Sequence, residues 1–197
     1  DVWMKEVFAN FMADKIMNPT FPEINHKLQF MISHYRGAYG EDRTRGTNPI
    51  RQHLDNLKNA GSLYGGIIYN KAPIMMRQLE AAIREKAFRD GIRRYIQTYA
   101  YGNATWNDLV EILDERTSIN LKDWSEVWVN QSGRPIITEG IEYENGKIAS
   151  FTLSQKAEDG SDKLWPQSFE ITLVYPDSTR VIPVKISDSV VNVKNVH

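Results

Sequence analysis

The sequence predicts an α+β protein of two domains, a helical domain over residues 1–135 and a small β-rich, sandwich-like domain over residues 136–197. In the first part, apolar residues recur every three or four positions, which is the spacing of helices that bury one face. After Gly133-Arg134-Pro135, apolar and polar residues alternate, as they do in half-buried strands. The chain has 197 residues, of which 41% are hydrophobic and 25% charged, so it has the composition of a folded protein with a core of its own.

Residues that usually begin or end helices delimit the helices of the first domain. Thr105 and Asp108 form the signature of a capping box for one helix, and Asn120 can cap the last one. Gly37 is placed to end the second helix, and residues 38–48, which are rich in Gly, Arg and Thr, are expected to form an exposed loop. The apolar spacing predicts helices over residues 2–17, 23–36, 71–83 and 85–99, with a short helical turn over residues 50–57.

Turn signals divide the β-rich domain into strands. Glu144-Asn145-Gly146 contains the Asn-Gly pair typical of a tight β-hairpin. Further turns are expected near Gly160 and at Pro176-Asp177-Ser178. We therefore expect strands joined by short turns.

Composition and charge exclude several classes of function. The chain has no cysteine, which excludes disulfides, thiolate metal sites and cysteine nucleophiles. A formal net charge of −1 provides no overall positive field, and the cations of residues 84–94 have acidic residues among them on the outer face of a predicted helix. No apolar run approaches the roughly 20 residues of a membrane-spanning helix. We therefore expect no nucleic-acid partner and no membrane span in this chain.

Five segments occur together in an order that is typical of one enzyme family. They are DVWMKEVFANF at 1–11, TNPI at 47–50, YNKAPIMMRQLE at 69–80, AFRDGIRRYIQTYAYGNATWNDLVEIL at 87–113 and LKDWSEVWVNQSGRPII at 121–137. Together they resemble the zinc aminopeptidases of the aminopeptidase N and leukotriene hydrolase type, which are gluzincins with a thermolysin-like catalytic domain. The resemblance implies that residues 1–135 are the helical C-terminal lobe of that domain. The β-rich part is then the start of the small β-sandwich domain that follows, and the chain is a multidomain fragment.

The resemblance implies that Glu6 is a zinc ligand. In the family, one zinc is bound by two His of an H-E-x-x-H helix and by a Glu in a W-L-N-E-G-F-A-like segment, which is WMKEVFA here. Lys5 and Val7 stand where the family usually has Asn and Gly. The residues by themselves leave a second interpretation open, in which Glu6 lies on the narrow polar stripe of an otherwise apolar helix.

The H-E-x-x-H helix is expected to be missing from this chain. In the family it lies about twenty residues before the zinc-binding Glu, and Asp1 is only five positions before Glu6. None of the four histidines has the spacing to replace the His pair, namely His26, His34, His53 and His197. The chain also begins within an amphipathic pattern, so it reads as a piece of a longer enzyme that is inactive alone.

Two tyrosines are the other candidate catalytic residues. Tyr69 in YNKAP resembles the tyrosine of the family motif Y-x-K-G, whose phenol donates a hydrogen bond to the oxyanion formed during peptide hydrolysis. Tyr64 in SLYGG resembles a second tyrosine found at this spacing in part of the family, where it lines the same cleft. Ala72 and Pro73 stand where the motif ends in Gly, a change that could shift the helix start. Without the resemblance, both tyrosines could simply be aromatic anchors of a Gly-rich turn.

The favoured hypothesis is a piece of a zinc metallopeptidase that removes N-terminal residues from peptides by means of zinc-activated water. Zinc is the implied cofactor, and peptide substrates and the upstream half of the same catalytic domain are the implied partners. Trp3, Phe8 and Phe11 are expected to be exposed at the cut edge and to promote self-association. The absence of cysteine favours a periplasmic or cell-envelope location over a cytoplasmic one.

Two alternatives remain open from the sequence. The first is a non-catalytic scaffold or binding protein that keeps the peptidase architecture, for which the departures at Lys5, Val7 and Ala72-Pro73 are the support. The second is a free-standing helical module with a β-rich interaction domain.

Overall fold

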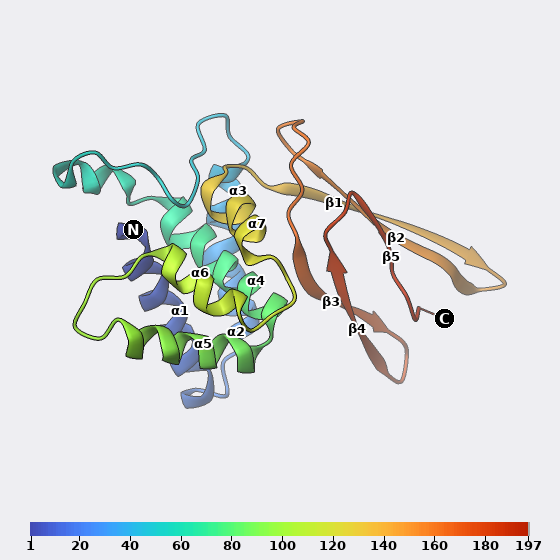
Figure 1. Cartoon of the computed structure of the whole chain (residues 1–197). Helices are drawn as coiled ribbons and strands as arrows, with labels where there is room; N and C mark the ends of the chain where they lie inside the picture. Colours follow the sequence, from blue (N-terminus) through green and yellow to red (C-terminus); the bar gives the residue numbers. More distant parts are fainter. Residues whose placement is uncertain (197) are drawn as a thin grey trace. The chain divides into compact units, whose positions relative to one another are not determined.

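A computed structural model of the chain describes residues 1–196, which divide into two compact units, Asp1–Gly133 and the part from Arg134 onward (Figure 1). Within these residues, the regular elements of the first unit are helices and those of the second are strands. This combination of helices and antiparallel sheets confirms the predicted α+β class. None of the described helices is long and apolar enough to cross a membrane.

Helix α1 (Val2–Thr20) organises the first unit by burying one face. The Trp3 ring lies 5.2 Å from the ring of Trp106, and the Phe11 ring lies 5.6 Å from the ring of Phe88. These contacts hold α1 against α5 (Glu85–Thr98) and α6 (Trp106–Asp114). The predicted helix over residues 2–17 is therefore confirmed, with Pro19 lying inside its last turn.

The expected exposure of Trp3, Phe8 and Phe11 is wrong. Trp3 and Phe11 are only 3% and 2% exposed, and Phe8 is partly buried and stacks on the ring of Tyr95 at 6.5 Å. The three side chains pack within the helical unit because α5 and α6 already cover that face of α1. Several of the large apolar side chains that the unit does expose lie at the end of α1 and in the next helix, namely Ile16, Met17, Leu28, Met31 and Ile32.

The second helix continues through Gly37. It consists of α2 (His26–Phe30), the π-helical turn η1 (Met31–Tyr35) and α3 (Arg36–Asp42). The prediction that Gly37 ends this helix is therefore wrong. The exposed loop predicted over residues 38–48 is also wrong in its first part, which is helical and in which Ala38 and Asp42 are buried. A Cβ at Gly37 would lie 2.5 Å from Nδ2 of Asn70, so this glycine permits close packing of two helices.

The predicted helical turn over residues 50–57 is also wrong. The amide of Arg51 donates to the carbonyl of Val129 at 2.9 Å, so it takes no part in a local turn. The side chain of Asn56 instead accepts a hydrogen bond from the amide of Lys58 and caps the 3₁₀-helix η2 (Leu57–Leu63).

The rest of the helical unit follows the predicted order. After the π-helical turn η3 (Ile67–Lys71) comes α4 (Ala72–Ile83), with Pro73 in its first turn as predicted. Thr105 and Asp108 form both hydrogen bonds of a capping box at the start of α6, and Asn120 caps α7 (Leu121–Ser125), which runs on into η4 (Glu126–Asn130). Both predicted caps are therefore confirmed.

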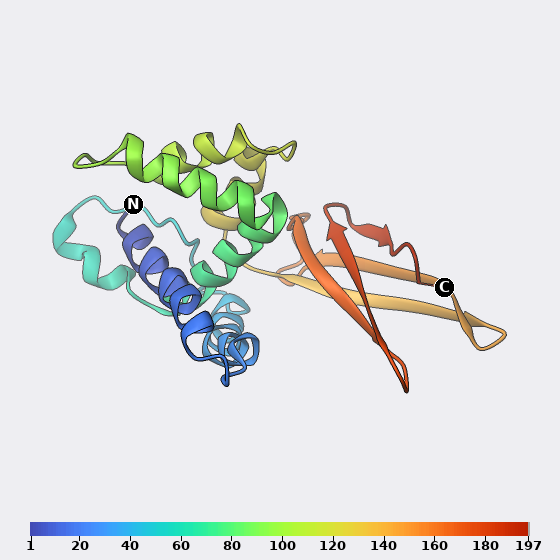
Figure 2. The same ribbon diagram turned by 90° about the horizontal axis from the view of Figure 1, so that it is seen from below.

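The second unit contains two antiparallel sheets. Strands β1 (Pro135–Glu144), β2 (Lys147–Ala157) and β5 (Val190–Asn192) form one sheet in the order β1-β2-β5. Strands β3 (Gln167–Val174) and β4 (Thr179–Ile186) form the other, and Figure 2 shows both long hairpins of the unit. The β1-β2 hairpin turns at Asn145 and Gly146, which have φ of 50° and 74°, as the Asn-Gly signal predicts. The apolar core of this unit includes Phe151, Leu153, Ile182, Val184 and Ile186.

Removal of the capping box at α6 provides a test of the helical unit. Thr105→Ala should lower the free energy of unfolding by about 1 kcal/mol, because it leaves the amide of Asp108 without its acceptor. Hydrogen bonds from Thr105 lower the pKa of Asp108, so the stabilisation by that carboxylate is present above its ordinary pKa and is lost as the pH falls through the lowered value. Urea unfolding followed by circular dichroism should therefore show a smaller difference between variant and wild type at about pH 3 than at neutral pH. The exposed Thr98→Ala serves as the control, and an equal effect of both changes would contradict this account.

Candidate active site

Glu6 lies at the border of the buried face of α1. Val7, the next residue, is fully buried, whereas the side chain of Lys5, the residue before, is 67% exposed. The Glu6 side chain is 26% exposed, and its Oε1 lies 3.5 Å from Nζ of Lys5. Glu6 is therefore a partly desolvated carboxylate with a protein cation beside it.

Tyr64 and Tyr69 come from the segment that connects η2 to α4. Tyr69 lies in the middle of η3, and its amide donates to the carbonyl of Gly65 at 3.0 Å. The rings of Tyr64 and Tyr69 stack with centroids 6.1 Å apart and planes inclined by 26°. Tyr69 as a whole residue remains 39% exposed.

The three candidate residues predicted from the sequence come together in the structure. The charge of the Glu6 carboxylate acts on the Tyr69 phenol, and Nζ of Lys5 lies 5.7 Å from the centroid of the Tyr64 ring. Partial loss of water raises the pKa of Tyr69, and the charge of Glu6 raises it further. Interaction with Tyr64, followed by the ion pair with Glu6, raises the pKa of Lys5. At neutral pH the cluster therefore contains an uncharged phenol donor and a charged ammonium group.

A carboxylate at this position fits one ligand of a zinc ion, but not a complete site. Carboxylate oxygen is a normal zinc donor, and Glu6 has the partial exposure that a ligand needs. Among residues 1–196, however, no group of three or more His, Cys, Asp or Glu side chains is arranged to hold a metal ion. Within these residues, Glu6 therefore belongs to no complete set of metal ligands.

The histidines bond to other groups. Nε2 of His26 lies 2.7 Å from the carbonyl of Phe21, and Nε2 of His53 lies 2.6 Å from Asp55 on the surface. Nδ1 of His34 lies 3.2 Å from the carbonyl oxygen of Tyr69, and its Nε2 lies 3.6 Å from Asp14. His197 lies outside the described residues. His34 therefore contacts the backbone of the candidate site without joining Glu6 as a ligand.

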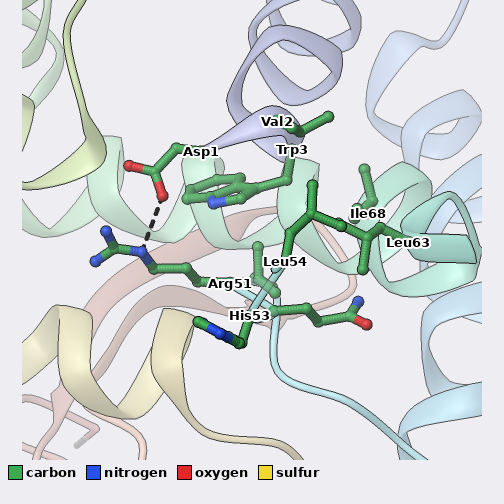
Figure 3. A pocket seen from close by; sticks show the side chains of 10 residues that line it. Asp1, Val2, Trp3, Arg51, His53, Leu54, Leu63 and Ile68 are labelled. Atoms are coloured by element: carbon green, nitrogen blue, oxygen red, sulfur yellow. Dashed lines mark ion pairs between the residues drawn. The ribbon is translucent and has the colours of Figure 1, made fainter. Parts of the chain in front are cut away.

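A pocket of about 470 Å³ lies at the start of α1 (Figure 3). Its lining includes Trp3, Leu63 and Ile68, which are sequence neighbours of the candidate residues, but not the candidate residues themselves. Figure 3 shows the side chains of Asp1 and Arg51 facing each other, with Nε of Arg51 2.9 Å from Oδ1 of Asp1. The amide of Trp106 donates to the other oxygen of Asp1 at 2.8 Å. Asp1 thus ties the start of α1 to the start of α6.

Sequence reasoning noted Lys5 only as a departure from the family pattern and missed its contacts. Its place next to Glu6 in an apolar helix could have indicated them, because a carboxylate in such a setting needs a cation nearby. The contact with Tyr64 depends on the fold and has no local signal.

The sequence profile of the peptidase family M1 domain matches residues 1–132, so the chain belongs to the M1 family. The resemblance drawn from the five segments is thereby confirmed.

Several relatives of the chain are named as aminopeptidases. Probable aminopeptidase 1 of Sulfurisphaera tokodaii is 28% identical over 173 residues, which is 87% of this chain and 22% of the relative. Aminopeptidase N of Streptomyces lividans is 30% identical over 160 residues, which is 80% of this chain and 19% of the relative. Puromycin-sensitive aminopeptidase of Caenorhabditis elegans is 28% identical over 171 residues, with 84% and 18% covered. The matched part is therefore about a fifth of the length of each relative.

The proximity of Glu6 and Tyr69 can be measured directly. In Glu6→Gln, the pKa of Tyr69 should fall toward the ordinary value of about 10, because a negative charge that raises it has been removed. Carbon-13 labelling of the tyrosine rings and an NMR titration would report this change, with Tyr69→Phe used to assign the signal. Glu23→Gln, at an exposed position, should leave the titration unchanged. The same Tyr69 pKa in Glu6→Gln and wild type would contradict the placement.

Proposed function

We propose that this chain supplies part of the active site of a zinc aminopeptidase, with Glu6 as one zinc ligand and Tyr69 as the donor to the oxyanion. The observation that carries the proposal is the contact between α1 and η3, two separate elements of an M1 fold, which brings Glu6 close enough to Tyr69 for its charge to raise the pKa of the phenol. The names of the relatives support the same class of reaction.

Glu6 suits the role of a ligand because it is fixed by its helix and only partly solvated. Trp3, Val7 and Phe11 anchor α1 in the core, so the Glu6 side chain has little freedom to move away. When bound, zinc would supply a Lewis acid that polarises the substrate carbonyl and activates water. The carboxylate of Glu6 would hold that ion in register with Tyr69.

Tyr69 suits the role of an oxyanion donor because its phenol keeps its proton. Its raised pKa means that the hydroxyl stays neutral at physiological pH and donates a hydrogen bond without bringing a negative charge. Such a donor contributes most when it points to the place where charge develops in the transition state. Tyr64 stacks on Tyr69 and would line the same cleft.

The remaining groups of the site would come from other parts of a longer polypeptide. We propose that these groups are the two imidazole ligands and a glutamate general base of an H-E-x-x-H helix, together with the residues that recognise the substrate's free amine. The relatives are several times longer than the matched region, which leaves ample sequence for them.

One observation favours a second function, that of a non-catalytic scaffold. Nζ of Lys5 already lies 3.5 Å from the Glu6 carboxylate, where it neutralises the charge that would attract a metal ion. The other departures do not favour this alternative, because Val7 and Ala72 are fully buried and do not enter the site. A longer protein that lacks the H-E-x-x-H helix would support the scaffold function.

The isolated chain should not hydrolyse peptides. A fluorogenic aminoacyl amide assay with added zinc should show no turnover above background, because one carboxylate cannot hold the ion or replace the general base. The longer protein, assayed in parallel, should be active. Turnover by residues 1–197 alone would show that the proposed division of the site is wrong.

Loss of the Tyr69 hydroxyl should affect the chemical step. In the longer protein, Tyr69→Phe should lower kcat by roughly 10²- to 10³-fold with little change in KM, because the phenol binds the transition state more strongly than the substrate. Tyr143→Phe, which removes an exposed hydroxyl on β1, is the matched control. A normal kcat for Tyr69→Phe would rule out the oxyanion role.

A further inference from the structure

A buried ion pair lies within the helical unit, apart from the groups discussed above. Nζ of Lys71 lies 2.7 Å from Oδ2 and 3.0 Å from Oδ1 of Asp42, and the two side chains are only 5% and 3% exposed. Asp42 Oδ1 also accepts hydrogen bonds from Oγ1 of Thr47 at 2.9 Å and from the amide of Gly133 at 3.1 Å. Lys71 donates in addition to the carbonyl of Gly133 at 2.7 Å. The pair therefore joins three segments that are distant in the sequence, residues 42–47, Lys71 and Gly133.

Lys71 belongs to the same π-helical turn as Tyr69. The turn η3 spans Ile67–Lys71, and Tyr69 is two residues before Lys71. π-Helical turns are rare, are less favourable than an α-helix, and often occur at functional sites. A tertiary interaction is therefore needed to hold the backbone in this conformation.

The Tyr69 ring contributes little to its own placement. It is 39% exposed, and its aromatic neighbour is the ring of Tyr64 at 6.1 Å. Its backbone, by contrast, is held at two points. The amide of Tyr69 donates a hydrogen bond to the carbonyl of Gly65, and the carbonyl oxygen of Tyr69 contacts His34. The position of the phenol thus depends mainly on the position of the η3 backbone.

We propose that Asp42 and Lys71 are positioning residues whose ion pair fixes the η3 backbone and thereby holds the Tyr69 phenol beside Glu6. The role of this ion pair in catalysis rests on the proposed function, whereas its effect on the position of Tyr69 concerns this chain alone.

Stability alone does not account for a charged pair at this place. Both groups lose their hydration, and apolar residues of similar volume often stabilise a core equally well or better. Charge-assisted hydrogen bonds differ from apolar contacts in having a defined direction and length. The geometry of the pair fixes the position of η3 relative to α3 and Gly133. Packing of methyl groups would define that position less strictly.

The test uses Lys71→Met in the full chain, with labelled tyrosine rings. We expect the nuclear Overhauser effect between the rings of Tyr64 and Tyr69 to be lost. We also expect hydrogen exchange of the Tyr69 amide to become faster by about tenfold or more. The stability-matched control is Leu113→Ala, which creates a cavity where Leu113 packs against Gly91. Lys86→Met is the charge-matched control, because it removes an exposed ion pair with Asp90.

The two controls should keep the ring contact and the protection of the Tyr69 amide. Retention of both signals in Lys71→Met, or their equal loss in Leu113→Ala, would overturn the proposal. Should Lys71→Met fail to fold, Asp42→Asn removes the charge but keeps an acceptor for Thr47 and Gly133. A weakened ring contact in that variant supports the proposal, and an unchanged one overturns it.

Kinetics of the longer protein separate this inference from the proposed function. If the ring contact is lost, kcat should fall while KM stays close to normal. A lost ring contact with unchanged kcat would support the positioning role of the ion pair but would refute the catalytic role of Tyr69.

Discussion

The packing of the apolar face of α1 is the constraint on which the rest of the helical unit depends. Trp3, Val7 and Phe11 occupy successive turns of one face and are nearly inaccessible to water, so the rotation of the helix about its axis is determined. That rotation leaves Glu6 at the margin of the core, next to η3. A carboxylate that stands among apolar residues in the sequence thereby lies close enough to Tyr69 for its charge to raise the pKa of the phenol.

Local signals were sufficient for much of the fold. Thr105, Asn120 and the Asn145-Gly146 pair each act through hydrogen bonds or backbone angles within a few residues, and each has its predicted role. The alternation after Gly133 likewise predicts the strands, because successive side chains of a strand point to opposite faces and only one face is buried. Such features depend little on distant parts of the chain.

Predictions failed where a distant contact decided the outcome. Gly37 has the local character of a helix end, but the helix continues because Asn70 packs against the glycine. The turn expected near residue 51 does not form, since the amide of Arg51 bonds to Val129. The ion pair of Asp42 and Lys71 has only a weak signal, a single cation in the apolar run IIYNKAPIMM, and its partner could not be identified without the fold. In the candidate site, Glu6, Tyr64 and Tyr69 could be selected by their resemblance to the family motifs. The contacts of Lys5 could be found only from the three-dimensional structure.

Zinc binding by the longer protein tests the role of Glu6 most directly. Its metal content would be measured after dialysis against a weak chelator, for the wild type, Glu6→Gln and the exposed control Glu23→Gln. Our account predicts about one zinc per polypeptide for the wild type and the control, and loss of the metal from Glu6→Gln, since three protein ligands are needed for a catalytic zinc site. Equal zinc content in all three proteins, or none in the wild type, would contradict it.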